Sequence, residues 1–291
     1  MANRKQKRRQ LKKKVLTSFR WGSLGLIAWL LTLSVAVTGA ATLSGGSPAH
    51  AESAKKFVII IDDLGNGMKG TQEMLSMPIK LNVAIMPFLP TTKKDAELAH
   101  QRGLDVLVHM PMEPRKGKKE WLGPGAITTD LSDEEIRKRV NAAIDEVPYA
   151  VAMNNHMGSK VTSDRRIMSI VLDVCKERGL FFVDSKTDQH SVVAELAAEK
   201  GLPPVENDIF LDDQYSIGHI SRQMKRAEEK LEQKDICVMI GHVGVPGLMT
   251  AGVIRDAIPR FTGKIETISI SDMVKQVWNW NPDPTLPTNN K

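Results

Sequence analysis

The sequence predicts an α/β protein in which seven to eight parallel strands alternate with helices and close into a (β/α) barrel. Three observations support this prediction. Short apolar runs recur through residues 52–278, and amphipathic segments with helix-capping residues separate most of them. The 291-residue chain is long for an ordinary domain but fits one barrel with a short tail. Its 42% hydrophobic and 25% charged residues are typical of a globular protein with a sizeable core.

The apolar runs give the expected strands in chain order. They cover residues 57–61, 81–86, 104–110, 149–155, 180–184, 207–212, 235–241 and 264–270. Helices are expected at residues 91–103, 131–147, 163–179 and 214–233. The first of these ends at a glycine, and the second opens with Ser132 and Glu135 in the spacing of a capping box. Strands that alternate with helices are parallel, because each crossover returns the chain to the same edge of the sheet.

The first 51 residues predict export of the rest of the chain. Residues 1–20 contain nine Lys or Arg and no acid, and residues 21–43 contain no charge. A small-x-small site at residues 49–51 completes the pattern of a cleaved signal peptide. The apolar run also reaches the ~20 residues that span a bilayer, so an uncleaved N-terminal membrane anchor is the alternative. In both cases the basic end stays in the cytoplasm and the body is exported.

The positive charge of the chain is concentrated in this leader. The formal net charge is +6, but nine of the 40 Lys and Arg residues lie in residues 1–20, against 34 Asp and Glu that all lie after them. The body is therefore mildly acidic, which argues against a nucleic-acid partner and limits membrane contact to the N-terminal segment. At the other end, residues 279–291 are rich in Pro and Asn and are expected to form a disordered tail.

The two cysteines, Cys175 and Cys237, both lie in apolar patterns. We expect both to be buried core residues. A disulfide between them is compatible with export, and their spacing resembles no zinc motif.

Polar and ionisable residues lie at the carboxyl ends of six of the eight expected strands, where the active sites of (β/α) barrels lie. They are Asp62 and Asp63, His109 and Glu113, Asn154, Asn155 and His156, Asp184 and Ser185, Asp212 and Asp213, and His242. A single histidine in such a place is more often structural than functional, but chance rarely places so many polar groups on one rim. A carboxylate with two neutral imidazoles is a common zinc set that leaves one position for water. A second carboxylate beside the ligand can act as a general base.

The adjacent acids Asp62 and Asp63 pose a geometric problem. Neighbouring residues of a strand point to opposite faces of the sheet, so both carboxylates reach one site only where the strand ends and the backbone turns. The segment that follows, residues 64–67, contains two glycines that allow such a turn.

Three segments together resemble one known family. "IIIDDLG", "HMPMEP" and "NNHMGS" are similar to those of the divergent polysaccharide deacetylase family, a branch of the carbohydrate esterases with the NodB-type (β/α) barrel. The resemblance spans residues 56–278. It implies that Asp62 is the catalytic base, that Asp63 binds a metal, and that His242 in "VMIGHVG" protonates the leaving amine.

The remaining ligands depart from the pattern of the ordinary members, which take two histidines from an H-x-x-x-H segment. Here Glu113 stands four residues after His109, at the position of the second histidine. His156 on the next strand could restore the second imidazole. We expect Asp63, His109 and His156 to hold a divalent metal, most simply Zn²⁺, with Glu113 orienting an imidazole. The alternative set with Glu113 as a ligand would favour Mg²⁺ or Mn²⁺.

The usual Arg-Pro motif is also absent, and two asparagines stand in its place. The further residues expected to support the site or to contact substrate are Asn155, Asp184, Ser185 and Asp213. The reaction implied is hydrolysis of N-acetyl groups from an amino-sugar glycan such as peptidoglycan. Trp121 is expected either to stack on a sugar or to pack in the fold. The main alternative is a non-catalytic glycan-binding or envelope-assembly protein that keeps the metal site. A phosphoesterase fits less well, because the chain lacks a Gly-rich phosphate loop and an Arg cluster.

Overall fold

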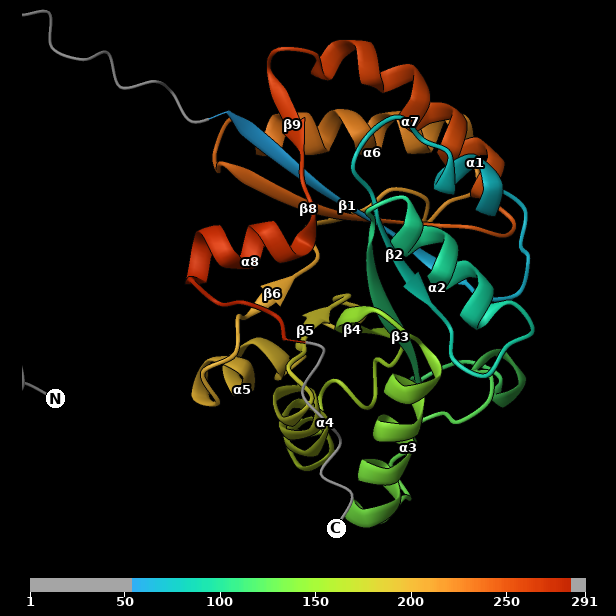
Figure 1. Cartoon of the computed structure of the whole chain (residues 1–291), viewed down its shortest axis with the longest axis vertical. Helices are drawn as coiled ribbons and strands as arrows, with labels where there is room; N and C mark the ends of the chain where they lie inside the picture. The colour runs from blue at the N-terminus through green and yellow to red at the C-terminus, as the bar shows by residue number, and fades with distance from the viewer. Residues whose placement is uncertain (1–53, 284–291) are drawn as a thin grey trace, which may run out of the picture. The chain divides into compact units, whose positions relative to one another are not determined.

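A computed structural model describes residues 54–283 of the chain (Figure 1). The leader expected at residues 1–51 lies outside the described residues, as do residues 284–291. The described residues, 54–283, belong to one compact unit. Between residues 54 and 283, no helix combines the length and the apolar character needed to cross a membrane.

Nine strands of the described residues form one parallel sheet. They are β1 (Lys55–Leu64), β2 (Asn82–Ile85), β3 (Asp105–Met112), β4 (Ala150–Met157), β5 (Phe181–Asp184), β6 (Val205–Glu206), β7 (Ile209–Phe210), β8 (Ile236–His242) and β9 (Ile265–Thr267). Eight of them follow the order β6-β5-β4-β3-β2-β1-β8-β7, and β9 pairs with the first residues of β1. The sheet curls into a half-barrel with helices around it, so the predicted (β/α)-barrel class is confirmed, but β6 and β7 at the ends of the sheet do not pair and the described residues do not close the barrel.

Helices pack around the outside of this sheet (Figure 1). They are α1 (Thr71–Leu75), α2 (Thr92–Gln101), α3 (Asp133–Glu146), α4 (Arg165–Glu177), α5 (Val193–Glu199), α6 (Ile217–Lys230), α7 (Gly247–Phe261) and α8 (Ile270–Trp278), with a 3₁₀ turn at Lys119–Trp121. The predicted cap of α3 is present, because the Ser132 hydroxyl accepts from the Glu135 N–H at 3.2 Å. The glycine after α2, Gly103, has φ +67°, as a helix-ending glycine does.

The strand side chains divide the core into two layers. Alternate residues of β1 show the division, since Phe57, Ile59 and Ile61 pack outward against the helices while Val58 and Ile60 pack inside the barrel. All five are fully buried, and burial of one such side chain contributes about 1.5–3 kcal/mol. The same alternation makes Asp62 the next inward side chain, and it lies at the end of the barrel formed by the carboxyl ends of the strands.

Helix α8 closes the other end of the barrel interior. Met273 and Val274 join the inner apolar layer, and the helix N-terminus is fixed to the starts of two strands. There the Asn82 amide oxygen accepts from Ile270 N at 2.7 Å, and the Asp105 carboxylate accepts from Ser271 N at 2.8 Å. The polar rim is consequently the open end.

Residues 279–283 of the expected tail contact the barrel. The Trp280 ring lies edge-on to Phe181 with centroids 5.5 Å apart, and Asp283 N donates to Gly179 O at 2.9 Å. Cys175 and Cys237 are buried free thiols, as the core interpretation predicts, and no disulfide joins them. Burial raises the pKa of Cys175 to about 12.

Candidate metal centre and catalytic site

The end of β1 brings two adjacent carboxylates to one rim. Asp62 follows the inward alternation of the strand and is 1% exposed. Asp63 has a left-handed backbone with φ +70°, a conformation that costs a non-glycine residue roughly 1–2 kcal/mol. The turn that follows needs Gly65, because a Cβ there would lie 2.8 Å from the Met86 carbonyl oxygen. The strained turn therefore lets both acids reach the same site.

Three side chains from three strands converge at this rim. Asp63 Oδ1 lies 3.2 Å from His109 Nε2 and 3.0 Å from His156 Nδ1, and the two nitrogens are 3.1 Å apart. The Asp63 oxygen is buried and has no hydrogen-bond partner of normal geometry among the described residues. One carboxylate and two imidazoles form a donor set that suits zinc.

The neighbours of the two rings show which nitrogens are free. His109 Nδ1 lies 2.8 Å from the Asn154 amide oxygen, and His156 Nε2 lies 3.2 Å from the Trp121 carbonyl oxygen. Both oxygens only accept hydrogen bonds, so each of these ring nitrogens carries the proton. The opposite nitrogens then direct lone pairs toward the Asp63 carboxylate. Two lone pairs and an anion at this separation repel unless a cation lies among them, so the residues present fit a bound metal.

The electrostatics of His109 lead to the same conclusion. Burial lowers the pKa of this ring, but the charge of Asp62 and the contact with Asp63 outweigh burial and raise it overall. Burial also opposes the charged form of Asp63, yet its contacts with His109 and His156 hold the pKa of that carboxyl well below the usual range. The site thus favours an ionised Asp63 with positive charge beside it.

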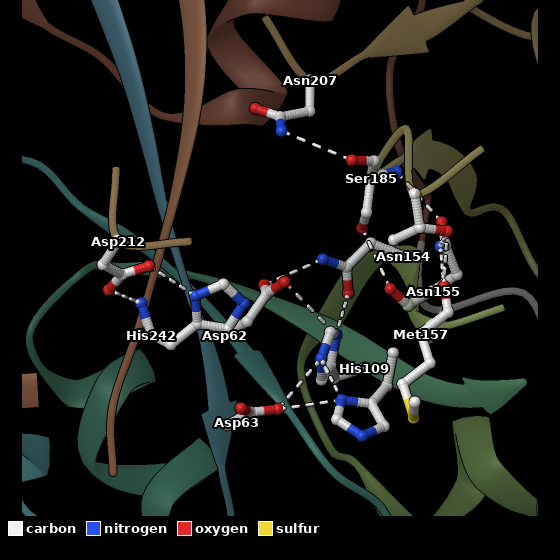
Figure 2. Close-up of polar contacts among 12 residues, drawn as sticks. Asp62, Asp63, His109, Asn154, Asn155, Met157, Ser185, Asn207, Asp212 and His242 are labelled. Carbon is white, nitrogen blue, oxygen red and sulfur yellow. Dashed lines mark hydrogen bonds and ion pairs between the residues drawn. The ribbon is translucent and has the colours of Figure 1, made fainter. Parts of the chain in front are cut away.

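Asn154 connects the metal centre to the expected base. It is fully buried, its amide nitrogen donates to Asp62 Oδ1 at 2.9 Å, and its oxygen holds His109 (Figure 2). The Asp62 bond fixes the orientation of the amide, because a carboxylate only accepts. Residues 152, 154 and 156 share the inner face of β4, so period-two alternation is the signal that would have selected Asn154 rather than its neighbour.

Asp62 itself lies between two imidazoles. Burial raises its pKa above the usual value, although His109, His242 and the amide of Asn154 each lower it. A buried carboxylate with a raised pKa is a stronger base than an exposed one.

His242 approaches the site from β8. Its Cα pairs in register with that of Asp62, and its ring is held by Asp212 through an Nδ1–Oδ1 contact of 2.7 Å. The other Asp212 oxygen accepts from His242 N at 2.8 Å and from the Thr250 hydroxyl at 2.7 Å. Burial lowers the pKa of His242, but Asp212, together with the charges of Asp62 and Asp63, outweighs burial and raises it to about 9. The ring is consequently a cation at neutral pH with Nε2 available to a substrate.

Glu113 does not orient an imidazole in this structure. Its carboxylate accepts from Thr129 N and the Thr129 hydroxyl, each at 2.8 Å, and from Lys160 Nζ at 2.7 Å. Burial opposes its charge, but Lys160 and Thr129 lower its pKa overall. The expected orienting role belongs instead to Asn154 and the Trp121 carbonyl, which occupy both ring N–H groups.

The other expected residues lie at different depths. Asn155 accepts from Ser185 N at 2.9 Å and donates to Met157 O at 2.7 Å, and both Asn155 and Ser185 line the pocket. Asp184 is fully buried and is not part of the pocket lining, and one of its oxygens accepts from Lys186 N at 2.8 Å.

The two acids that follow β7 contact different histidines. Asp213 lines the pocket and contacts His219 Nε2 at 2.5 Å, while its neighbour Asp212 is the residue that holds His242. Sequence reasoning placed both acids at the rim but selected Asp213 for support. Only the register of β7 against β8, Phe210 beside Ile240, shows which acid reaches the histidine.

These groups surround one pocket of about 440 Å³. Asp62, Asp63 and His242 are among the polar residues that line it. Trp121 and Tyr215, which are 59% and 62% exposed, present aromatic surface on its lining.

A curled parallel sheet whose rim carries this set of acids and histidines defines a NodB-like (β/α)-barrel protein. Residues 59–274 match the family described as divergent polysaccharide deacetylase, and the chain belongs to that family.

Two sequence relatives and two solved structures are similar to this chain. An uncharacterized protein of Haemophilus influenzae is 31% identical over 80% of this chain and 79% of its own length. The uncharacterized protein YibQ of Escherichia coli is 31% identical over 81% of this chain and 72% of its own. The crystal structure of the uncharacterized protein ATU2773 from Agrobacterium tumefaciens shares 17% identity over 78% of this chain and 92% of its own, with a TM-score of 0.70. The crystal structure of the Xyl-CE4 domain of a multidomain xylanase, from a Trinervitermes trinervoides hindgut metagenome, shares 11% identity over 79% of this chain and 93% of its own, with a TM-score of 0.50. The two solved structures share the fold with this chain.

Proposed function

We propose that the protein is an exported, metal-dependent hydrolase that removes N-acetyl groups from an amino-sugar polysaccharide. One observation carries the proposal. A buried carboxylate, Asp62, lies between a metal-binding cluster and a cationic histidine, linked to the first by Asn154 and paired in register with the second. Hydrolysis of an amide needs a base for water and an acid for the leaving nitrogen, and this arrangement supplies both.

The metal would be held by Asp63, His109 and His156. Zn²⁺ is the ion that this donor set suits best, and when bound it lowers the pKa of water to about 7 and polarises the acetyl carbonyl. The protein's own part is to fix both ring tautomers and to keep Asp63 ionised, which it does through Asn154, the Trp121 carbonyl and the two imidazoles.

Two residues would carry the proton transfers. Asp62 removes the proton from the attacking water, and Asn154 keeps one of its oxygens oriented by a hydrogen bond of 2.9 Å. His242 donates its Nε2 proton to the departing nitrogen, and Asp212 stabilises the charged ring before the transfer. Each such group is expected to contribute ~10²–10⁴-fold to the rate.

The pocket lining supports a sugar as substrate. Exposed aromatic rings such as those of Trp121 and Tyr215 bind the apolar faces of sugar rings while the polar centre receives the acetamido group. Export through the N-terminal leader would bring the protein to the glycans of the cell envelope, of which peptidoglycan is the candidate substrate.

A second candidate function is glycan binding or envelope assembly without turnover. The departures that favour it are Glu113, in place of the second histidine of the H-x-x-x-H segment, and Asn154-Asn155, in place of the Arg-Pro motif that the resemblance leads one to expect. Asn154 supplies one neutral hydrogen bond to Asp62, whereas an arginine would supply a positive charge.

Acetate release separates the two functions. Purified full-length protein is incubated with peptidoglycan and chitin oligomers, with and without added Zn²⁺, and released acetate is measured. The hydrolase proposal requires acetate release that a chelator abolishes and Zn²⁺ restores. Asp62→Asn and His242→Ala are the matched controls, since both should keep the metal and lose turnover. Metal binding and glycan binding without acetate release would favour the second function.

A further inference from the structure

We propose that the catalytic pocket continues into a cationic shelf that binds an anionic group, a carboxylate or a phosphate, on the same glycan chain. The cationic shelf is the hollow formed by Arg115, Lys116, Thr187, Asp188 and His190. The inference rests on the proposed function for the identity of the reacting sugar. It adds the class of substrate, an anionic rather than a neutral amino-sugar polymer.

The shelf and the catalytic pocket share a wall. Thr187 lines both hollows, and its hydroxyl donates to Met157 O at 2.8 Å and lies 3.4 Å from the Asn155 amide nitrogen. Asn155 and Met157 also line the catalytic pocket. An extended ligand can therefore pass from the metal centre across Thr187 to the shelf.

Arg115 is fixed in the shelf by three contacts. Its Nε lies 2.7 Å from Asp188 Oδ2, its Nη2 donates to the Ser163 hydroxyl at 2.6 Å, and its backbone N–H donates to the Ser159 hydroxyl at 2.9 Å. These contacts leave Nη1 of the guanidinium free, and 52% of the side chain is exposed. A guanidinium held in place loses little entropy when it binds an oxyanion.

Asp188 organises the shelf but does not neutralise it. Besides Arg115, its carboxylate accepts from His190 N at 2.8 Å and contacts His190 Nδ1 at 2.9 Å. Its side chain is 8% exposed, so little of this negative charge faces the hollow. Lys116 is exposed and forms no ion pair with any described residue. Arg115 and Lys116 thus place two cations at the shelf against one screened anion.

The surrounding sequence adds to the positive charge. Residues 115–120, "RKGKKE", contain four cations and one acid, whereas the chain after residue 20 has more acids than bases. A local excess of this sign, beside a pocket and against the trend of the body, favours an anionic ligand.

The catalytic pocket offers an anionic substituent no comparable excess of positive charge. Asp62, Asp63 and Asp213 all line it, and their charges offset those of His242 and of the proposed divalent metal, so this end suits an uncharged acetamido group. The shelf attracts the same substituent at the other end. The groove thus sets the register of the chain, with the N-acetyl group at the acids and the carboxylate or phosphate at Arg115 and Lys116.

The test compares anionic with neutral oligomers by binding. Full-length protein with Asp62→Asn, which prevents turnover, is titrated calorimetrically with a tetrasaccharide of alternating N-acetylglucosamine and N-acetylmuramic acid, with a phosphodiester-bearing amino-sugar oligomer, and with chitotetraose. We expect at least one anionic oligomer to bind more tightly than chitotetraose. Its affinity should fall as salt rises, because exposed charges are screened. The tighter of the two anionic oligomers identifies carboxylate or phosphate as the group recognised.

Charge reversal then locates the interaction. Lys116→Glu should weaken binding of the anionic oligomer about three- to tenfold and leave the affinity for chitotetraose unchanged. Lys225→Glu on α6 makes the same change in net charge at a side chain that is 76% exposed and outside both hollows, and it should have no effect. Circular dichroism and melting curves establish that both variants are folded.

The outcomes are distinguishable. Equal binding of anionic and neutral oligomers, or an equal loss in the Lys116 and Lys225 variants, would overturn the shelf proposal. Selective binding of the anionic oligomer by a protein that releases no acetate would support the shelf and remove the hydrolase function. Acetate release from neutral and anionic oligomers with equal efficiency would retain the hydrolase and remove the shelf.

Discussion

Two hydrogen-bond acceptors, the Asn154 amide oxygen and the Trp121 carbonyl oxygen, decide which nitrogen of each rim histidine is free. Asn154 also contacts Asp62, the proposed base, so one side chain orients groups of both the candidate metal centre and the proposed proton transfer. Glu113, which the sequence pattern places near the metal, is instead bound to Thr129 and Lys160. The residues that support a metal site are thus decided by side-chain direction rather than by proximity in sequence.

This difference predicts how metal affinity responds to mutation. His156→Ala should bind Zn²⁺ far more weakly, because it removes a ligand, and Asn154→Ala should bind it ~10–100-fold more weakly, because it removes the partner that orients His109. Glu113→Ala should bind Zn²⁺ nearly as well as the unaltered protein, since its carboxylate touches neither imidazole. Competition titration with a zinc-binding dye measures all three. A loss in Glu113→Ala as large as that in His156→Ala would make Glu113 the ligand.

Asp212 predicts the alkaline limit of activity. Asp212 is the main group that raises the pKa of His242 to about 9, so the acid form is present below about pH 9 and is lost above it. In Asp212→Asn the negative charge of Asp212 no longer opposes the effect of burial, which lowers the pKa of His242. The alkaline limb of kcat/KM should therefore move to lower pH.

The same variant has a readout that does not depend on turnover. The His242 ring should titrate at lower pH in the NMR spectrum of Asp212→Asn than in that of the unaltered protein. Because the folded pKa is raised above the ordinary value of 6.5, the Asp212–His242 pair stabilises the fold fully below about pH 6.5, and this stabilisation is lost as pH rises through about 9. An unchanged ring titration would show that Asp212 does not control the acid.

At the scale of secondary structure, the turn after β1 is the element on which the site depends. It holds Asp63 at φ +70° and contains Gly65 at φ +116° and Gly67 at φ +58°. A Cβ at Gly65 would meet Met86 O at 2.8 Å, whereas a Cβ at Gly67 would meet no heavy atom within 4 Å.

The two glycines form a matched pair for a stability test. Gly65→Ala combines a strained backbone with a steric clash and should destabilise the fold by about 1–3 kcal/mol. Gly67→Ala introduces no clash, so it should cost only the roughly 1–2 kcal/mol of a non-glycine residue in the left-handed backbone conformation. Urea denaturation measures both, and zinc affinity should fall in Gly65→Ala because Asp63 is displaced. Equal stability of the two variants would show that the turn adapts to the added methyl group.

Strand periodicity explains which elements could be predicted. Each of the eight apolar runs contains a strand, because a buried parallel strand is a continuous hydrophobic segment. Strand β6, Val205–Glu206, is missed because Val205 is its one apolar residue and Glu206 is exposed, whereas the equally short β7 lies inside the apolar run at residues 207–212. The rim residues were found because strand ends are visible in sequence. Period-two alternation from Ala152 could also have selected Asn154 over Asn155. The choice of Asp212 over Asp213 depends on side-chain direction after a strand has ended, which a run of apolar residues does not define.

For the molecule as a whole, the barrel class followed from the alternation of strands and helices, but the way its ends are closed did not. The amphipathic run of α8 does not show that the helix lies across the starts of β2 and β3, where Asn82 and Asp105 hold its N-terminus. These are contacts of high sequence separation. They leave the carboxyl ends of the strands as the open face, where the acids, the histidines and the cationic shelf lie together.

The last prediction concerns the mature form of the chain. The signal-peptide pattern predicts cleavage after Ala51, and strand β1 begins at Lys55, so cleavage there would leave the described compact unit of residues 54–283 complete. N-terminal sequencing of protein recovered outside the cytoplasm should therefore begin at Glu52. Full-length chain confined to the membrane fraction would instead identify residues 21–43 as an anchor. Recovery from the cytoplasm would contradict export, and with it access to an envelope glycan.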